Sequence, residues 1–207
     1  MMKENISADL YRYFGQTNFK TFCRCMMLPG FRYTYFFRKA ALHKKKSFLG
    51  VFYRLLLRRY MIKYGIQIGA DTQIGRGLHI YHFGAIVVSP GARIGKNCSL
   101  SSCITIGQTN RGSRKGYPTL GDRVFVGGGA VIVGNVTIGD NVLIALNAYV
   151  NVDVPSNSIA IGNPAKIIAD EHATQDYIVN VVGEMAENSL PQTTIKAGES
   201  KTMVHSI

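Results

Sequence analysis

Two histidines that could do chemistry, His79 and His82, lie in one short segment with Tyr81 between them. An imidazole titrates near neutral pH, so a histidine can take the proton of an acceptor hydroxyl whose own pKa is far higher. Removing such a base typically lowers a rate by about 10²- to 10⁴-fold. The residue types alone, however, favour a structural role for His82. We expect His79 to point outward and to have a surface or secondary site role rather than a role as base.

Metal chemistry is not indicated by the sequence. No cluster of histidines and cysteines has the spacing of metal ligands, so we expect no metal site. The cysteines fit no disulfide framework by their spacing either. We therefore predict reduced thiols in a cytoplasmic protein, with Cys98 filling the core.

A regular repeat surrounds the two histidines and predicts the element that positions them. A branched aliphatic residue recurs, mostly at a six-residue step, at Ile68, Ile74, Ile80, Val88, Ile94, Leu100, Ile106, Leu120, Val126, Ile132, Ile138, Ile144 and Val150. A short fixed period indicates a solenoid, in which each unit buries its apolar side by stacking on the next. Six residues fit a short strand and a turn, so three units make one triangular coil. The thirteen positions predict roughly four coils, which end near residues 154–155.

The repeat is interrupted at two places. The step from Ile80 to Val88 is eight residues long and contains Tyr81 and His82, and a fourteen-residue step extrudes the loop 107–119. Insertions in a repeat fall on its surface and often cluster on a functional face. The interruptions are therefore the first places to look for a site.

Residues 1–64 form a separate region that is basic and predicted to be helical. Residues 1–65 carry fourteen Lys or Arg against two acids, whereas residues 66–207 carry ten of each. The clearest helix is expected from about residue 47 to 64, where the period changes at Gly65. Such a segment suits contact with an anionic membrane, which would place the protein at the inner face of the membrane. The alternative is a solvated or docked helical face, and nucleic-acid binding is disfavoured because no recognition motif accompanies the charge.

The chain after the repeat is expected to be less ordered. The six-residue period is lost from about Asp170, and Pro191 and Gly198 interrupt the segment. We therefore predict that residues 169–207 form a partly disordered C-terminal tail.

Several segments resemble the hexapeptide-repeat acyltransferases, and within them the serine acetyltransferase-like branch, which includes transferases of polysaccharide gene clusters. They are HIYHFGAIVV, SSCITIGQTNRG, VGGGAVIVGNVTIGDNV and VPSNSIAIGNPAKII. The resemblance covers residues 65–168. It implies a mainly β chain with a left-handed parallel β-helix, in contrast to the usual right-handed crossover. It also implies a homotrimer with acetyl-CoA sites between neighbouring subunits.

The resemblance assigns His82 as the general base. The serine enzymes have an orienting carboxylate fifteen residues earlier, where this chain has Gln67. A carboxamide oxygen can accept the second ring N–H but cannot stabilise imidazolium with a full charge. Asp71 or a carboxylate of another subunit is an alternative partner. The positions that match the acetyl-CoA cleft are Gly107, Thr109, Gly128, Ala130 and Lys166.

The acceptor side departs from the serine-specific pattern. The acid before the catalytic histidine is replaced by Tyr81, and the Arg-His pair late in the loop is replaced by Gly116-Tyr117. An amino-acid acceptor needs a partner for each of its charges, because neither charge is readily desolvated alone. Tyr81 and Tyr117 offer flat faces with hydroxyl groups, which suit a sugar, while Arg111 could supply a cation from another direction.

Three functions follow from these observations. The first is an acetyl-CoA-dependent O-acetyltransferase that acts on a sugar hydroxyl in surface polysaccharide biosynthesis, with Tyr81, Tyr117 and Arg111 binding the acceptor. The second is a serine O-acetyltransferase of cysteine biosynthesis. The third is a non-catalytic trimeric β-helix scaffold, which predicts no stabilisation by CoA.

Overall fold

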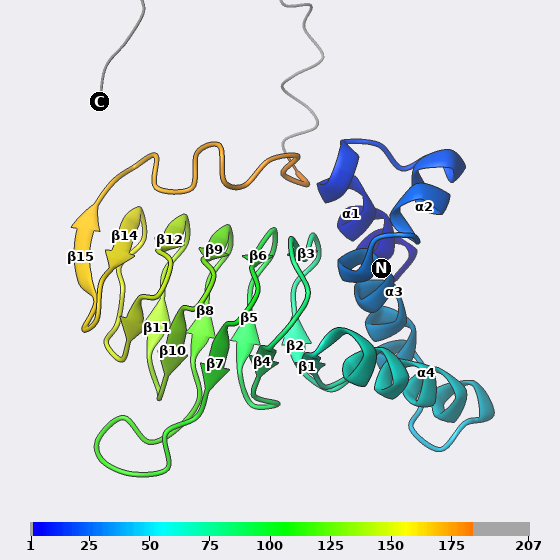
Figure 1. The fold of residues 1–207 in the computed structure, drawn as a ribbon, viewed down its shortest axis with the longest axis horizontal. Coiled ribbons are helices and arrows are strands. Elements are labelled where there is room, and N and C mark those ends of the chain that lie inside the picture. The colour runs from blue at the N-terminus through cyan, green and yellow to red at the C-terminus, as the bar shows by residue number, and fades with distance from the viewer. Residues whose placement is uncertain (1, 184–207) are drawn as a thin grey trace, which may run out of the picture.

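A computed structural model describes residues 2–183 of the protein. These residues form a triangular solenoid with helices at one end (Figure 1). Four helices precede the solenoid in the described part of the chain: α1 (Met2–Phe14), α2 (Phe19–Cys25), α3 (Pro29–Leu42) and α4 (Phe48–Tyr64). The strands are β1 (Ile66–Ile68), β2 (Gln73–Ile74), β3 (His79–Ile80), β4 (Ile86–Val88), β5 (Arg93–Ile94), β6 (Ser99–Leu100), β7 (Thr105–Gly107), β8 (Thr119–Leu120), β9 (Val124–Val126), β10 (Val131–Val133), β11 (Thr137–Ile138), β12 (Val142–Ile144), β13 (Tyr149–Val150), β14 (Ser158–Ile161) and β15 (Lys166–Ala169).

The strands form the three faces of the solenoid. The first face, sheet A, has the order β1-β4-β7-β10-β13, the second, sheet B, has β11-β8-β5-β2, and the third, sheet C, has β15-β14-β12-β9-β6-β3. All pairs are parallel except β14 with β15. From β1 to β13, successive strands belong to successive faces, as expected when three six-residue units close one coil. The predicted parallel β-helix after a helical region is confirmed.

The number of coils differs from the prediction. The strands make about five coils rather than four, because the chain continues past Val154 into β14, whose inward residue is Ala160. In this last coil Val154 pairs with Ile138 through a single bridge. The step from Val150 to Val154 is four residues, so the six-residue pattern does not detect the fifth coil.

The repeated aliphatic residues fill the interior of the solenoid. Ile68, Ile106 and Ile132, one from each of three coils of sheet A, are fully buried. Equivalent residues lie above one another because each strand pairs in register with the strand one coil away, as Ile106 does with Ile132. At one corner, glycine is required by the close approach of the coils: a Cβ at Gly95 would lie 2.3 Å from the carbonyl oxygen of Gly121.

The segment after the β14–β15 hairpin runs back along the outside of the coils to the helices (Figure 1). We call residues 170–183 the C-terminal strap. Its Ala173, Thr174 and Ile178 side chains are buried. The structure therefore places this first part of the tail against the coils, while the partial disorder predicted for residues 169–207 stays a prediction, because residues 184–207 lie outside the described residues.

Local sequence signals explain the last helix. The Ser47 hydroxyl accepts a hydrogen bond from the Gly50 N–H at the start of α4, and Gly65 ends the helix with φ of +63°. The helix buries Leu57 and Tyr64. Its apolar residues Phe48 and Ile62 instead face outward, and Phe48 is 85% exposed in the single chain.

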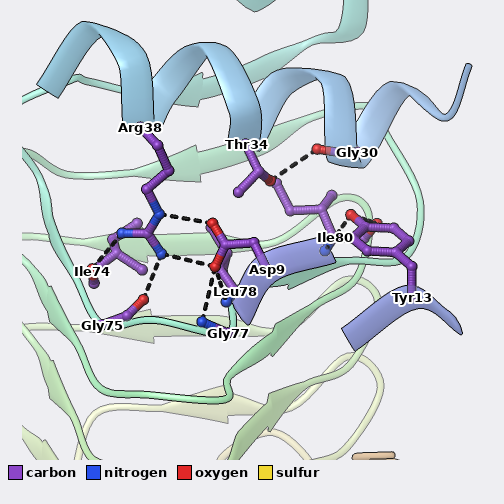
Figure 2. A network of polar contacts seen from close by, with 10 residues as sticks. All are labelled: Asp9, Tyr13, Gly30, Thr34, Arg38, Ile74, Gly75, Gly77, Leu78 and Ile80. Atoms are coloured by element: carbon purple, nitrogen blue, oxygen red, sulfur yellow. Dashed lines mark hydrogen bonds and ion pairs between the residues drawn. The ribbon is translucent and has the colours of Figure 1, made fainter. Parts of the chain in front are cut away.

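The helices cover the unpaired edge of the first coil through a buried ion pair (Figure 2). The Arg38 guanidinium donates to both carboxylate oxygens of Asp9, at 2.8 and 3.1 Å, and also to the carbonyl oxygens of Ile74 and Gly75. Asp9 in turn accepts from the N–H groups of Gly77 and Leu78, each at 2.8 Å. Burial raises the pKa of the Asp9 carboxyl, and the Arg38 charge and the two N–H groups oppose that shift.

Two tyrosines complete this cover. The Tyr33 hydroxyl donates to the Ile68 carbonyl oxygen at 2.7 Å and accepts from the Ile68 N–H at 3.2 Å. The Tyr13 hydroxyl makes the same pair of contacts with Ile80, at 3.2 and 3.3 Å (Figure 2). The edge strands β1 and β3 thus obtain hydrogen bonds that a preceding coil would otherwise supply.

Asp9→Asn tests the role of the buried pair. The variant keeps the size of the side chain but leaves the Arg38 guanidinium buried without a counter-charge, so we expect unfolding to become easier by about 3–5 kcal/mol. Asp71→Asn is the matched control, because Asp71 is half-exposed and pairs with Lys45 and Arg54 on the surface. Its expected cost is below about 1 kcal/mol. Urea unfolding measures both, and equal losses would contradict the assigned role of Asp9.

Candidate functional site

His82 lies at the corner where the chain passes from β3 to β4, and its side chain is exposed. The long step makes this corner wider than its equivalents, with Gly84 and Ala85 at φ of +105° and +49°. The corner is held from both sides, because Gly84 O accepts from Cys103 N and Gly65 O accepts from Ile86 N. The interruption of the repeat therefore places His82 on a projecting corner that backbone hydrogen bonds hold on both sides.

A cavity of about 370 Å³ lies beside His82. Its lining comes from Tyr13 of α1, from residues 28–30 at the start of α3 and from residues 79–83. None of these lining residues is Lys, Arg, Asp or Glu. Within one chain, the cavity thus offers aromatic faces and neutral hydrogen-bonding groups and no side-chain partner for an ionic group.

His79 lies on the outer face of β3, as predicted, but it is buried there, so the expected surface role is wrong. The side chain is 7% exposed, and its ring lies between Tyr13 and Tyr81 with centroid distances of 4.2 and 4.1 Å. Burial, and then the charge of Arg12, lower the pKa of His79 to about 3. His79 is therefore neutral at physiological pH. The repeat could not predict this burial, because it depends on α1 covering the outer face of β3.

Tyr81 is fixed by the C-terminal strap. Its hydroxyl donates to the Tyr177 carbonyl oxygen at 2.8 Å, and its ring lies 5.9 Å from the Phe125 ring. Burial raises the pKa of the Tyr81 hydroxyl. Tyr81 lines the cavity beside His82 as predicted for an acceptor residue, but its hydroxyl is already engaged.

Gln67 lies on β1 with its side chain exposed on the outer face of sheet A. It lines a mainly apolar groove of about 390 Å³ with Met61 and Gly107, among others. Within residues 2–183, no hydrogen bond joins Gln67 to His82, and its orienting role stays a prediction. Asp71 is not a substitute in this chain, because Lys45 and Arg54 bind its carboxylate at 2.9 and 3.1 Å.

The loop 107–119 projects from a different corner, between sheets A and B (Figure 1). Thr109 and Gly116 close it with two backbone hydrogen bonds, and Arg114 pairs with Asp153 at 2.8 Å. Tyr117 packs on Gly91, where a Cβ would lie 2.6 Å from the ring. Tyr117 and the exposed Arg111 are therefore not brought together with His82 in one chain.

The residues predicted to bind acetyl-CoA occupy several places. Gly107 lines the groove beside Gln67, Thr109 is at the base of the loop and Lys166 is exposed on β15. Gly128 lies at the same corner as His82, two coils further on. Ala130 is fully buried among the inward residues, so its methyl group does not face a cleft.

The glycines of the predicted cleft differ from the corner glycines. A Cβ at Gly107 would meet its nearest atoms at 3.4 and 3.6 Å, and one at Gly128 at 3.6 and 3.8 Å, which are ordinary contacts. Neither residue has a positive φ that favours glycine. The fold therefore does not require glycine at these two positions, whereas it does at Gly95. This difference favours a ligand role for Gly107 and Gly128.

Three residues near the site were missed from the sequence: Tyr13, Phe125 and Tyr177. Each reaches the His79–Tyr81 segment from a distant part of the chain, so one sequence has no local signal for the contact. The apolar run YIVNVV at residues 177–182 was the available hint that the strap is packed. Among residues 2–183, no group of three or more His, Cys, Asp or Glu side chains is suited to a metal ion, and no helix is long and apolar enough to cross a membrane.

Comparisons with known proteins identify the family. The family of bacterial transferase hexapeptide repeats matches residues 117–151. A serine acetyltransferase of Helicobacter pylori (strain ATCC 700392 / 26695) is 36% identical over 147 residues, which cover 70% of this chain and 85% of that protein. This chain belongs to the serine acetyltransferase family. It is accordingly an O-acetyltransferase with a hexapeptide-repeat fold.

Solved serine acetyltransferases have the same architecture. The enzyme of Neisseria gonorrhoeae superposes with a TM-score of 0.68 at 26% identity, over 82% of this chain and 67% of that one. The soybean apoenzyme gives 0.68 at 28% identity, over 81% and 69%. These relatives do not confirm the predicted resemblance to polysaccharide O-acetyltransferases, and they favour the alternative that was based on serine.

Gly107→Ala tests whether the groove beside Gln67 holds the donor. Because the fold has room for the methyl group, we expect unfolding to change by less than about 1 kcal/mol. If the groove holds acetyl-CoA, its KM should rise at least about fivefold, because the methyl group occupies the space of the ligand. Gly95→Ala is the control, because a Cβ at this position would clash with the backbone of Gly121. This variant should lower the stability of the fold and leave the KM of acetyl-CoA unchanged. An unchanged KM in Gly107→Ala would exclude Gly107 from the donor site.

Proposed function

We propose that this enzyme transfers the acetyl group of acetyl-CoA to the hydroxyl of L-serine. The observation that carries the proposal is the match to the H. pylori serine acetyltransferase over 85% of its length, with His82 beside a cavity. A solved relative from N. gonorrhoeae in complex with serine has a TM-score of 0.67 and 28% identity, over 81% of this chain and 69% of that one. The roles of individual residues of this chain in binding CoA or serine are part of this proposal.

The chemistry proposed for His82 is direct transfer. The imidazole takes the proton of the acceptor hydroxyl as its oxygen attacks the thioester carbonyl. The bond from the carbonyl carbon to sulfur then breaks, and His82 returns the proton to the CoA thiolate. Backbone N–H groups near the cleft are suited to stabilise the intermediate oxyanion. No acyl-enzyme is required.

A neutral hydroxyl compound such as a sugar is the second candidate acceptor. The observation that favours it is the cavity beside His82, because no charged side chain lines it. A zwitterionic acceptor would need its partners from elsewhere, since an unpaired ionic group is costly to desolvate. Arg111 of a neighbouring subunit is the cation proposed for this role. The link to surface polysaccharide rests on the earlier resemblance alone.

Assembly as a homotrimer completes the site in this proposal. His82 and the loop 107–119 lie at different corners of one chain, so a neighbouring subunit is needed to bring Tyr117 or Arg111 to His82. The same arrangement would place Lys166 and Gly128 on a donor site shared between subunits. Cytoplasmic location and contact of residues 1–64 with an anionic membrane stay predictions.

Release of CoA from acetyl-CoA tests the function. We expect turnover with L-serine in the wild type, and a rate about 10²- to 10⁴-fold lower in His82→Ala because the base is lost. His43→Ala, a change at the C-terminal end of α3 and outside the cavity lining, is the control and should keep its rate.

A comparison of L-serine with neutral monosaccharides as acceptors separates the two candidate functions. Turnover with neutral monosaccharides and none with serine would overturn the serine proposal and favour the second candidate. A wild-type rate in His82→Ala would overturn the assigned base for either acceptor.

A further inference from the structure

We propose that the C-terminal strap is a positioning element of the acceptor site, which it controls by holding Tyr81 beside His82. The inference rests on the proposed role of His82 as the base. It assigns a function to residues 170–183, which lie outside the repeat. The strap contributes a backbone carbonyl and an aromatic ring, and Tyr81 is the positioning residue on which both act.

The strap is anchored at both ends to asparagines of the coils. Asn141 donates to the Glu171 carbonyl oxygen at 2.8 Å and accepts from the Thr174 hydroxyl at 2.6 Å. Asn97 donates to the Val182 carbonyl oxygen at 3.2 Å and accepts from the Val182 N–H at 3.1 Å. These anchors fix the path of the chain between them, which includes Tyr177.

The middle of the strap reaches the site through aromatic side chains. The Tyr177 ring lies 5.0 Å from the Phe125 ring on β9, and Phe125 lies 5.9 Å from Tyr81. Tyr81 then contacts His79, and His79 contacts Tyr13 of α1. The row therefore connects the strap to the helices across the outer face of β3, with Tyr81 at its centre.

Tyr81 has few other polar restraints. Its hydroxyl donates to the Tyr177 carbonyl oxygen at 2.8 Å, and the neighbouring His79 has its Nδ1 buried without a hydrogen-bond partner. Tyr81 is also 39% exposed and lines the cavity next to His82. The hydrogen bond to the strap is thus the polar contact that determines the position of the Tyr81 side chain, which forms one wall of the cavity.

A shift of the strap would change the cavity and leave the donor groove as it is. The groove beside Gln67 and Gly107 lies on sheet A, and its lining contains no strap residue. Loosening the strap should therefore affect the KM of the acceptor and not that of acetyl-CoA. A merely structural role would instead lower stability and affect both substrates alike.

Two variants of the full chain test the proposal. Tyr81→Phe removes only the hydroxyl, and Thr174→Val removes an anchor of the strap that does not line the cavity. Because a hydrogen bond is lost in each, we expect the acceptor KM to rise about three- to tenfold, with the KM of acetyl-CoA within about twofold. Tyr149→Phe, on β13, is the control and should leave both constants unchanged.

A second measurement does not depend on knowing the acceptor. We expect amides of residues 171–183 to exchange hydrogen faster in both variants, and His82 to react faster with diethyl pyrocarbonate, as followed by mass spectrometry. Hydrogen exchange and His82 reactivity test the role of the strap even if neither serine nor a sugar is acetylated. An unchanged acceptor KM, or unchanged exchange and His82 reactivity, overturns the proposal, and so does an equal rise in both KM values.

Discussion

The first coil of a β-helix has no neighbour on one side, so its backbone N–H and C=O groups need partners from another element. In this protein the partners are side chains of α1 and α3. The buried Asp9–Arg38 pair serves the stretch from Ile74 to Leu78, and two tyrosine hydroxyls serve Ile68 and Ile80. Because His82 follows Ile80 by two residues, the helices that cover the edge also support the corner that carries the proposed base.

This dependence explains why the fold was largely predictable and its cover was not. The solenoid follows from a repeat in which each aliphatic residue, such as Ile106, meets its equivalent one coil away. The pairing of Asp9 with Arg38 and Gly77 joins three segments with no common period. The burial of His79 has the same origin, since α1 and not the repeat determines its surroundings. The fifth coil was missed because Val154 breaks the step.

The site was predictable in part for the same physical reason. His82 could be singled out because it interrupts the ladder, and the family match gave the interruption a chemical meaning. The partner of Tyr81 could not be found, because the Tyr177 carbonyl belongs to a segment without periodicity. Tyr117 and Arg111 are on a corner distant in the coil from His82, so their contribution depends on a second copy of the chain. The structure shows what one chain provides, and the contribution of neighbouring subunits stays a proposal.

The central claim is that the helical cover holds the coil that carries His82, and Tyr13→Phe tests it most directly. This variant removes the hydroxyl that binds both backbone groups of Ile80 and keeps the ring against His79. Hydrogen exchange of residues 77–83 and kcat for acetyl transfer would be measured together. The account predicts faster exchange there with a lower kcat, while exchange in β9, β10 and β12 is unchanged. Faster exchange with an unchanged kcat, or unchanged exchange in residues 77–83, would contradict it.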